Sequence, residues 1–122
     1  MKLQLSNSAH QKIFTAHGPG YVAVSGMRYE RPVVVTPQQV LTDWPPQDFA
    51  ALAESHFAYL LALQPEVVLL GTGSRQQFPH PALHRQLAAA GIGVEIMDTA
   101  AACRTYNLLV ADDRKVVAAI LL

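Results

Sequence analysis

The feature that most restricts the fold of this chain is a pair of apolar segments, residues 67–70 and 94–97, joined by a glycine turn and a short helical stretch. A continuous apolar run that ends at a glycine turn, then a helix and a second apolar run, is typical of a βαβ unit with largely buried parallel strands. Parallel neighbours need a crossover connection, which is usually a helix. Residues 65–98 therefore predict an α/β fold with a crevice, and they do not name a reaction.

Length and composition restrict the class of protein. The chain has 122 residues, which predicts a single domain over residues 1–122. Nine Lys and Arg residues balance nine Asp and Glu residues, so the chain lacks the basic excess that favours nucleic acid or anionic lipid. With 51% hydrophobic and 15% charged residues, and apolar runs shorter than the 18 or so that a membrane span needs, we expect a soluble globular protein.

The location and the redox chemistry follow from the first residues and from the cysteine count. Residues 1–7 hold one basic residue, and no apolar core precedes His10, so the sequence shows neither a secretory signal nor an Arg-rich transit peptide. The expected location is the cytoplasm. Cys103 is the single cysteine, which excludes an internal disulfide and a cysteine-clustered zinc site.

The N-terminal half predicts a β-rich, antiparallel part. Its strand segments are rich in β-branched residues and are bounded by glycine and proline, and residues 26–30 are expected to be a polar reversal. The expected strands are residues 12–16, 21–25, 32–36 and 40–44. From Phe49 to about Leu63 the apolar period becomes 3.6, which predicts the first helix, with Asp48 in its first turn.

The C-terminal half predicts two helices and a last strand. Pro81 suits the start of the crossover helix and Gly91 its end. Thr99 is the expected N-cap of a third helix over residues 100–109, which should bury Cys103 as a small hydrophobe. Residues 116–121 are the last strand, expected either antiparallel to a neighbour or at a sheet edge.

Ligands of open α/β sheets bind outside the carboxyl ends of parallel strands. Those ends carry two glycines, two hydroxyls and a cation on one loop, and the start of a helix on the other. A helix start binds anions through its free N–H groups, whereas an adjacent carboxylate opposes them. The candidate crevice residues are Gly71, Thr72, Gly73, Ser74, Arg75, Asp98, Thr99 and Arg104. Taken alone, the two glycines are better explained by a tight strand-to-loop turn than by a ligand site.

Other chemical motifs are weaker. Gln76 stands where a dinucleotide fingerprint needs its third glycine, and the chain contains no Gly-Lys-Ser/Thr phosphate loop. His80 and His84 have the spacing of a metal-binding pair, but without an obvious third ligand we expect His80 to cap a helix and His84 to face water. A reactive Cys103 would need a nearby base, and no histidine is close in sequence. No metal or cofactor is expected.

Two further pairs of residues have surface or turn roles in this interpretation. Asp112 and Asp113 are expected in a solvated turn, and Tyr106 and Asn107 are expected to pack and to satisfy that turn. Arg28, Arg31 and Trp44 are expected to contact a partner rather than to catalyse.

The chain resembles a known family, most specifically in its C-terminal half. The resemblance rests on Pro65 and the strand after it, Gly71-Thr72-Gly73, Phe78, Pro81, Leu87, Gly91, Glu95-Ile96-Met97-Asp98-Thr99, Ala102, Arg104-Thr105-Tyr106-Asn107, Leu109, Arg114 and Val116, and extends to Tyr21, Gly26 and Pro37. These residues are similar to the Mth-like domain-of-unknown-function family, which includes mitochondrial respiratory complex I assembly factor 3 and an adipogenesis-associated mammalian protein. The resemblance implies a three-layer α/β fold around a mixed sheet, and no established enzyme activity.

Two functions from different classes follow. The first is a non-catalytic binding or assembly module with a protein partner, since no acid, base, nucleophile and metal set converges in the sequence. The second is a binder of a small anionic metabolite, or an enzyme acting on one, in the crevice between residues 71–75 and the helix that starts at Thr99. A homo-oligomer is compatible with either function.

Overall fold

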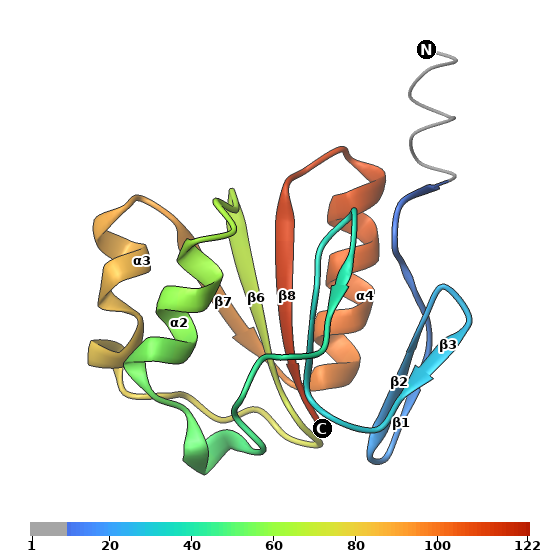
Figure 1. Cartoon of the computed structure of the whole chain (residues 1–122), viewed down its shortest axis with the longest axis horizontal. Helices are drawn as coiled ribbons and strands as arrows, with labels where there is room; N and C mark the ends of the chain where they lie inside the picture. The colour runs from blue at the N-terminus through green and yellow to red at the C-terminus, as the bar shows by residue number, and fades with distance from the viewer. Residues whose placement is uncertain (1–9) are drawn as a thin grey trace.

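The computed structural model describes residues 10–122, and these form two sheets (Figure 1). Residues 1–9, where the sequence predicts no targeting segment, lie outside the described residues. In the larger sheet the strand order is β5-β4-β8-β6-β7, with β6, β7 and β8 parallel and β4 antiparallel to both β5 and β8. Its strands are β4 (Val33–Val35), β5 (Val40–Leu41), β6 (Val67–Thr72), β7 (Gly93–Met97) and β8 (Val116–Leu121). The predicted α/β fold with a βαβ unit and a mixed sheet is confirmed.

The smaller sheet is an antiparallel meander. It consists of β1 (Phe14–Gly18), β2 (Tyr21–Val24) and β3 (Met27–Tyr29), in sequence order. The expectation that residues 26–30 are only a polar reversal was wrong. Ser25 and Gly26, with φ angles of 48° and 86°, complete the reversal in two residues, and the chain then pairs with β2 as β3.

The last strand corrects a second expectation. β8 is not at a sheet edge: it lies between β4 and β6, and it is parallel to β6. The crossover that this requires is α4 (Thr99–Ala111), which carries the chain from β7 to β8, and residues 112–115 only close the turn. The pairing of β8 with β4 is antiparallel, as the alternative expectation had it.

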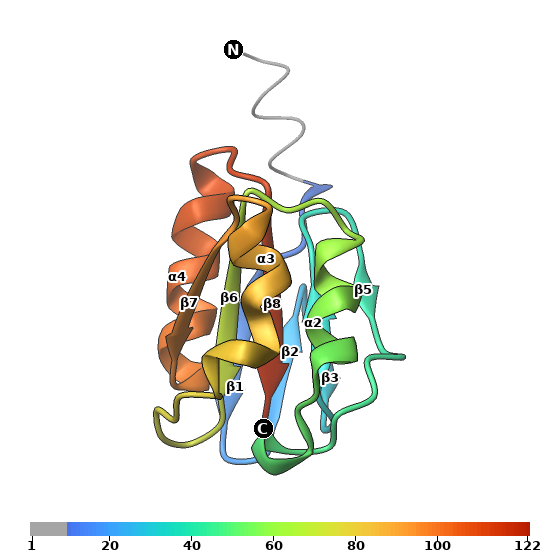
Figure 2. The same cartoon turned by 90° about the vertical axis from the view of Figure 1, so that its left-hand side faces the viewer.

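Alternation along β8 separates two hydrophobic cores. Val116, Ala118 and Ile120 belong to one core, while Val117, Ala119 and Leu121 belong to the other. One core lies under α4 and the small sheet. The other lies under α2 (Glu54–Leu61) and α3 (Arg85–Ala89), which stand side by side over the opposite face of the sheet (Figure 2). The three-layer arrangement follows from this division.

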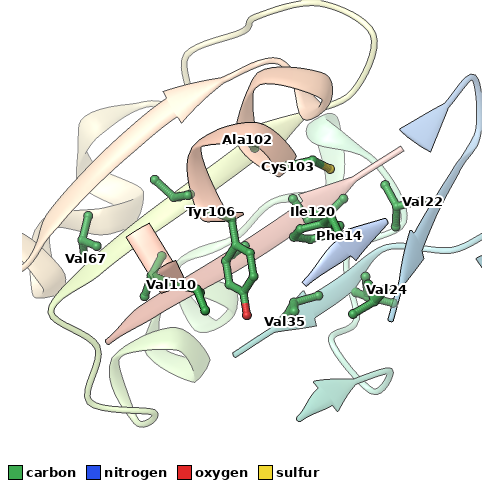
Figure 3. Packing of buried hydrophobic residues seen from close by; sticks show 14 residues of the cluster. Phe14, Val22, Val24, Val35, Val67, Ala102, Cys103, Tyr106, Val110 and Ile120 are labelled. Carbon is green, nitrogen blue, oxygen red and sulfur yellow. The ribbon is translucent and has the colours of Figure 1, made fainter. Parts of the chain in front are cut away.

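In the first core, side chains from the small sheet meet those of α4 (Figure 3). The rings of Phe14 and Tyr106 form an edge-to-face pair with centroids 5.1 Å apart. Cys103 is buried among these apolar groups, as expected, and burial raises the pKa of its thiol from 9.0 to about 12. Burial also raises the pKa of Tyr106.

These raised pKa values predict a loss of stability at alkaline pH. The folded-state pKa of Cys103 is above its unfolded value, so its contribution is complete below pH 9.0 and is lost as the pH rises toward 12. At pH 10 the free energy of unfolding should fall by about 1.4 kcal/mol from this thiol alone. Urea denaturation at neutral pH and at pH 10 measures this loss, and the Cys103→Ala variant should show a smaller decrease. An equal decrease in both proteins would contradict the assignment to Cys103.

The first helix is shorter than its apolar period predicts. Phe49–Ala51 form a 3₁₀ turn (η1), and Leu52 and Ala53 are extended before α2 begins at Glu54. Asp48 caps η1 through a hydrogen bond from the Ala51 amide to its carboxylate (3.0 Å) rather than starting a longer helix. The break lets Leu52 enter the second core with Phe57 and the other apolar residues of α2.

Trp44 lies in the second core and is 3% exposed, so it does not offer the exposed ring that its expected role as a partner contact requires. Its indole N–H donates to the carbonyl oxygen of His56 on α2 (3.1 Å). A large aromatic side chain with a satisfied N–H is well suited to a buried position. Pairing in β5 already ends at Leu41, so the strand expected over residues 40–44 is shorter than predicted and Trp44 lies outside it.

Candidate functional site

At the carboxyl end of β6, the hydroxyl of Thr72 folds the loop that follows. It donates to the carbonyl oxygens of Arg75 (2.7 Å) and Met97 (3.2 Å), and it accepts from the amide of Gln77 (3.1 Å). Thr72 is 3% exposed. The hydroxyl that the sequence offers to a ligand is therefore used to shape the loop.

Thr99 makes an equally internal set of contacts. Its hydroxyl accepts from the amide of Gly73 (2.9 Å) and donates to the carbonyl oxygen of Leu121 (2.6 Å), while its own amide donates to the carbonyl oxygen of Gly73 (2.9 Å). One buried threonine thus ties the start of α4 to the ends of β6 and β8.

The N-cap of α4 is Asp98, not Thr99 as the sequence led us to expect. The carboxylate of Asp98 accepts from the Ala101 amide (2.8 Å), and its carbonyl oxygen accepts from the Ala102 amide (3.0 Å). Aspartate is a strong N-cap and its charge suits the helix dipole. The helix therefore starts one residue earlier than predicted, which leaves the Thr99 hydroxyl to bond across the sheet.

Glycine is required at positions 71 and 73 for different structural reasons. A Cβ atom on Gly71 would lie 3.0 Å from the Thr99 hydroxyl oxygen and 3.2 Å from the Ala102 methyl, so glycine lets α4 pack closely on the sheet. Gly73 has a φ angle of 92°, which other residues rarely adopt, and this is the conformation of a tight strand-to-loop turn.

Part of the predicted crevice forms a depression, which we call the strand-end depression. Its volume is about 450 Å³, and one wall holds Gly73, Ser74, Asp98, Thr99 and Ala100. The other wall is residues 17–20, which are the end of β1 and its turn into β2, with Leu122 alongside. The sequence showed residues 17–20 only as a turn. No local signal pairs them with α4, because the pairing depends on the small sheet docking.

The remaining candidates lie apart from this depression. Gly71 and Thr72 are buried behind its wall, and Arg75 is exposed on the loop without lining it. Arg104 lines a different hollow of about 390 Å³ between α4 and β1, together with Cys103 and Asn107. The expected cation is therefore not beside the start of α4, where the Asp98 carboxylate opposes an anion.

The exposure of Arg75 predicts that its side chain does not support the fold. We expect Arg75→Ala to change the free energy of unfolding by less than about 0.5 kcal/mol. The matched variant Thr72→Val removes the hydroxyl that bonds to the Arg75 carbonyl, and should cost about 1–3 kcal/mol. Urea denaturation of both variants measures the contrast. A loss in Arg75→Ala as large as in Thr72→Val would show that the arginine side chain, not the backbone, holds the loop.

A further hollow, the connecting groove, lies where the chain passes from the small sheet to the large one. It consists of two adjoining depressions, of about 450 and 620 Å³, that share Glu30, Arg31, Pro32 and Thr42. Arg28 lies at one end, with its guanidinium 3.9 Å from the centre of the Tyr21 ring and its Nε 2.7 Å from the Glu30 carboxylate. Arg28 and Arg31, which the sequence marked as partner contacts, both line this groove.

His80 and His84 lie at the two ends of the short 3₁₀ turn that starts the crossover helix. The Nδ1 atom of His80 accepts from the Ala82 amide (3.0 Å), so His80 caps the 3₁₀ turn η2 (Pro81–His84) as predicted. His84 faces water only in part, because its ring packs 5.6 Å from that of Phe57 and is partly buried. Within residues 10–122, no three His, Cys, Asp or Glu side chains are grouped closely enough to bind a metal ion.

Comparison with known proteins shows the family of this chain. Residues 14–121 match the model of the family described as "Protein of unknown function (DUF498/DUF598)". The chain belongs to this family. The match includes both sheets and all the candidate crevice residues, and the resemblance to the Mth-like family is confirmed.

Two relatives of the DUF498 chain have different names. It is 33% identical over 117 residues to the "13 kDa major membrane protein" of Francisella tularensis, and the match covers 95% of each chain. It is 35% identical over 104 residues to NADH dehydrogenase [ubiquinone] 1 alpha subcomplex assembly factor 3 of Bos taurus, a match that covers 84% of this chain and 55% of the bovine protein. The chain therefore spans about half of that relative.

Solved structures agree with the fold of the DUF498 chain. A crystal structure of a protein from Bordetella parapertussis, 42% identical, superposes with a TM-score of 0.86 and covers 91% of this chain and 95% of that one. A solution structure from Bordetella pertussis, described as a Mth938-like domain, is 35% identical with a TM-score of 0.79, covering 90% and 85%. In residues 10–122 of the present chain, no helix has the length and apolar character needed to cross a membrane.

Proposed function

We propose that this DUF498 chain is a non-catalytic protein-binding module of the assembly type, formed by one domain over residues 1–122. The observation that carries the proposal is the connecting groove, where Arg28, Tyr29 and Arg31 line an open hollow. Arginine and tyrosine are enriched at the energetic centres of protein interfaces. The name of the bovine relative, an assembly factor, supports a protein as the ligand.

The strand ends support catalysis less well than the connecting groove supports protein binding. The hydroxyls of Thr72 and Thr99 are both engaged in bonds to backbone groups, and burial raises the pKa of the Cys103 thiol, so it is not a ready nucleophile. A reaction would need a nucleophile or base presented to the hollow. The strand-end depression is lined instead by backbone, small side chains and a capping carboxylate.

Charge reversal in the groove tests the proposal. The full chain carrying Arg31→Glu should recover less of its partner from lysate than the wild type, because the substitution changes the sign of a charge on the groove wall. Arg75→Glu, an equal change at an exposed arginine outside the groove, is the matched control and should recover as much as the wild type. No specific partner, or equal recovery by all three proteins, would contradict the proposal.

A second candidate, a small anionic ligand, is favoured by one observation: the strand-end depression places the start of α4 opposite His17. Thermal-shift measurements with phosphate, nucleotides and carboxylates test it, since a ligand at one hundred times its dissociation constant adds about 2.7 kcal/mol of stability. His17→Ala should abolish the shift and Arg75→Ala should not, because only His17 lines the depression. The absence of a thermal shift with all three ligand classes would rule out this candidate.

The proposed location is the cytoplasm, and self-association is the remaining expectation about partners. Cell fractionation tests the location directly, and it matters because the Francisella relative is named a membrane protein. Recovery of the chain in the membrane fraction after a high-salt wash would contradict a cytoplasmic location. Light scattering of the purified chain distinguishes a monomer from a homo-oligomer.

A further inference from the structure

His56 holds together the start of α2 and the segment that carries Trp44. Its Nδ1 atom accepts a hydrogen bond from the Ala53 amide (3.0 Å), which makes the imidazole the cap of the helix start. Its carbonyl oxygen accepts from the Trp44 indole N–H (3.1 Å), and the two rings meet edge to face with centroids 6.3 Å apart. Ala53, the N-cap residue, has no polar side chain of its own for this task.

The cap works in only one protonation state. A neutral imidazole can accept at Nδ1, whereas a protonated one carries N–H groups on both ring nitrogens. Protonation of His56 would therefore place an N–H donor against the Ala53 amide donor. It would also place a positive charge in the first turn of a helix, where the helix dipole opposes it.

Within residues 10–122, none of the titratable neighbours of His56 forms an ion pair with its ring. On its own helix, Glu54 is exposed and the Tyr59 hydroxyl donates to the Asp43 carboxylate. The elements that contact α2 are η2 and α3, which contribute His84 and Arg85, with His80 at the N-cap of η2; the segment before α2 carries Asp43 and Asp48. Asp48 caps η1, His80 caps η2, and His84 packs on Phe57. Burial is the cause that lowers the pKa of His56 below 6.5.

We propose that protonation of His56 is a switch that opens the first turn of α2 and releases Trp44 from the second core. The opening is local because the residues before the turn, Leu52 and Ala53, are already extended. Trp44 also lines the connecting groove, so the switch changes the wall of that groove at acid pH. The proposal stands independently of whether the groove binds a protein.

The single tryptophan makes the switch measurable. As the pH falls from 6.5, the equilibrium constant for opening should rise about tenfold per pH unit until the folded-state pKa is reached. We expect tryptophan emission to move to longer wavelength, and acrylamide quenching to increase, while far-UV circular dichroism keeps most of its amplitude. In His56→Gln this transition should vanish, because a glutamine at this position accepts the same bond and does not titrate.

His84→Gln is the matched control, since it removes another histidine beside the same helix and should keep the wild-type transition. In the wild type, the NMR titration of the Trp44 indole N–H should have the same midpoint as the His56 ring, which provides a second test that needs no variant. Equal acid transitions in the wild type and His56→Gln would overturn the proposal. Different midpoints for the indole and the His56 ring, or an emission that does not change before global unfolding, would overturn it as well.

Discussion

Replacing Thr99 with valine should cost about 2–4 kcal/mol of unfolding free energy, since it leaves two buried backbone groups without a partner. The groups are the amide of Gly73 and the carbonyl oxygen of Leu121, which the Thr99 hydroxyl bonds at 2.9 and 2.6 Å. Valine has nearly the same shape as threonine and enters the first turn of α4 without a clash, so the missing hydroxyl is the main change. Urea denaturation measures the loss.

Two variants separate this role from helix capping. Thr99→Ser keeps the hydroxyl and should lose far less stability than Thr99→Val. Asp98→Ala removes the N-cap that the structure shows, and should cost about 1 kcal/mol, the usual value of a cap. A valine variant as stable as the serine variant would mean that solvent or a backbone shift satisfies Gly73 and Leu121 instead.

The second large effect is expected at Asn107, whose side-chain amide makes the pair of hydrogen bonds that a neighbouring strand would make. It accepts from the amide of Phe14 (2.9 Å) and donates to the carbonyl oxygen of Phe14 (2.8 Å), so it covers the open edge of β1. Asn107→Asp keeps the shape but replaces the donor with an acceptor that faces that carbonyl. We expect a loss of about 2–3 kcal/mol, together with faster amide hydrogen exchange in β1 and β2.

The control for Asn107→Asp places the same charge one residue further along α4. Leu108 is 72% exposed, so Leu108→Asp should change stability by about 0.5 kcal/mol or less. At acid pH the difference in free energy of unfolding between Asn107→Asp and the wild type should become smaller, because a protonated carboxyl can again donate to the carbonyl oxygen of Phe14. A loss equal to that of Leu108→Asp would show that the amide pairing does not hold the small sheet in place.

For Asn107 the sequence suggested a different partner. We expected Tyr106 and Asn107 to satisfy the turn that follows, yet both bond to a segment more than ninety residues earlier, since the Tyr106 hydroxyl also donates to the carbonyl oxygen of Lys12 (2.9 Å). Hydrogen bonds over such a separation leave no periodic pattern in the sequence. Local spacing can show that a polar side chain lies on a helix, but not which distant edge it covers.

The same limit explains why the candidate crevice was predicted only in part. Residues 71–75 and 98–99 were correctly placed at the carboxyl ends of β6 and β7, because strand ends are marked by glycine and by the change of period. The direction of their side chains was not predictable. Thr72 and Thr99 turn inward to backbone groups, Arg75 points to solvent outside the depression, and Arg104 lines another hollow.

The sequence by itself determined the class of fold, because the apolar run at residues 67–70 and the helix after it allow few arrangements other than a βαβ unit. It also determined the burial of Cys103 and the cap at His80, which depend on neighbours within one helix turn. Only the tertiary structure decided the central place of β8, the burial of Trp44 and the inward turn of Thr99. Each of these depends on which elements pack against one another, and the free energy that favours this packing comes from contacts between residues far apart in the chain.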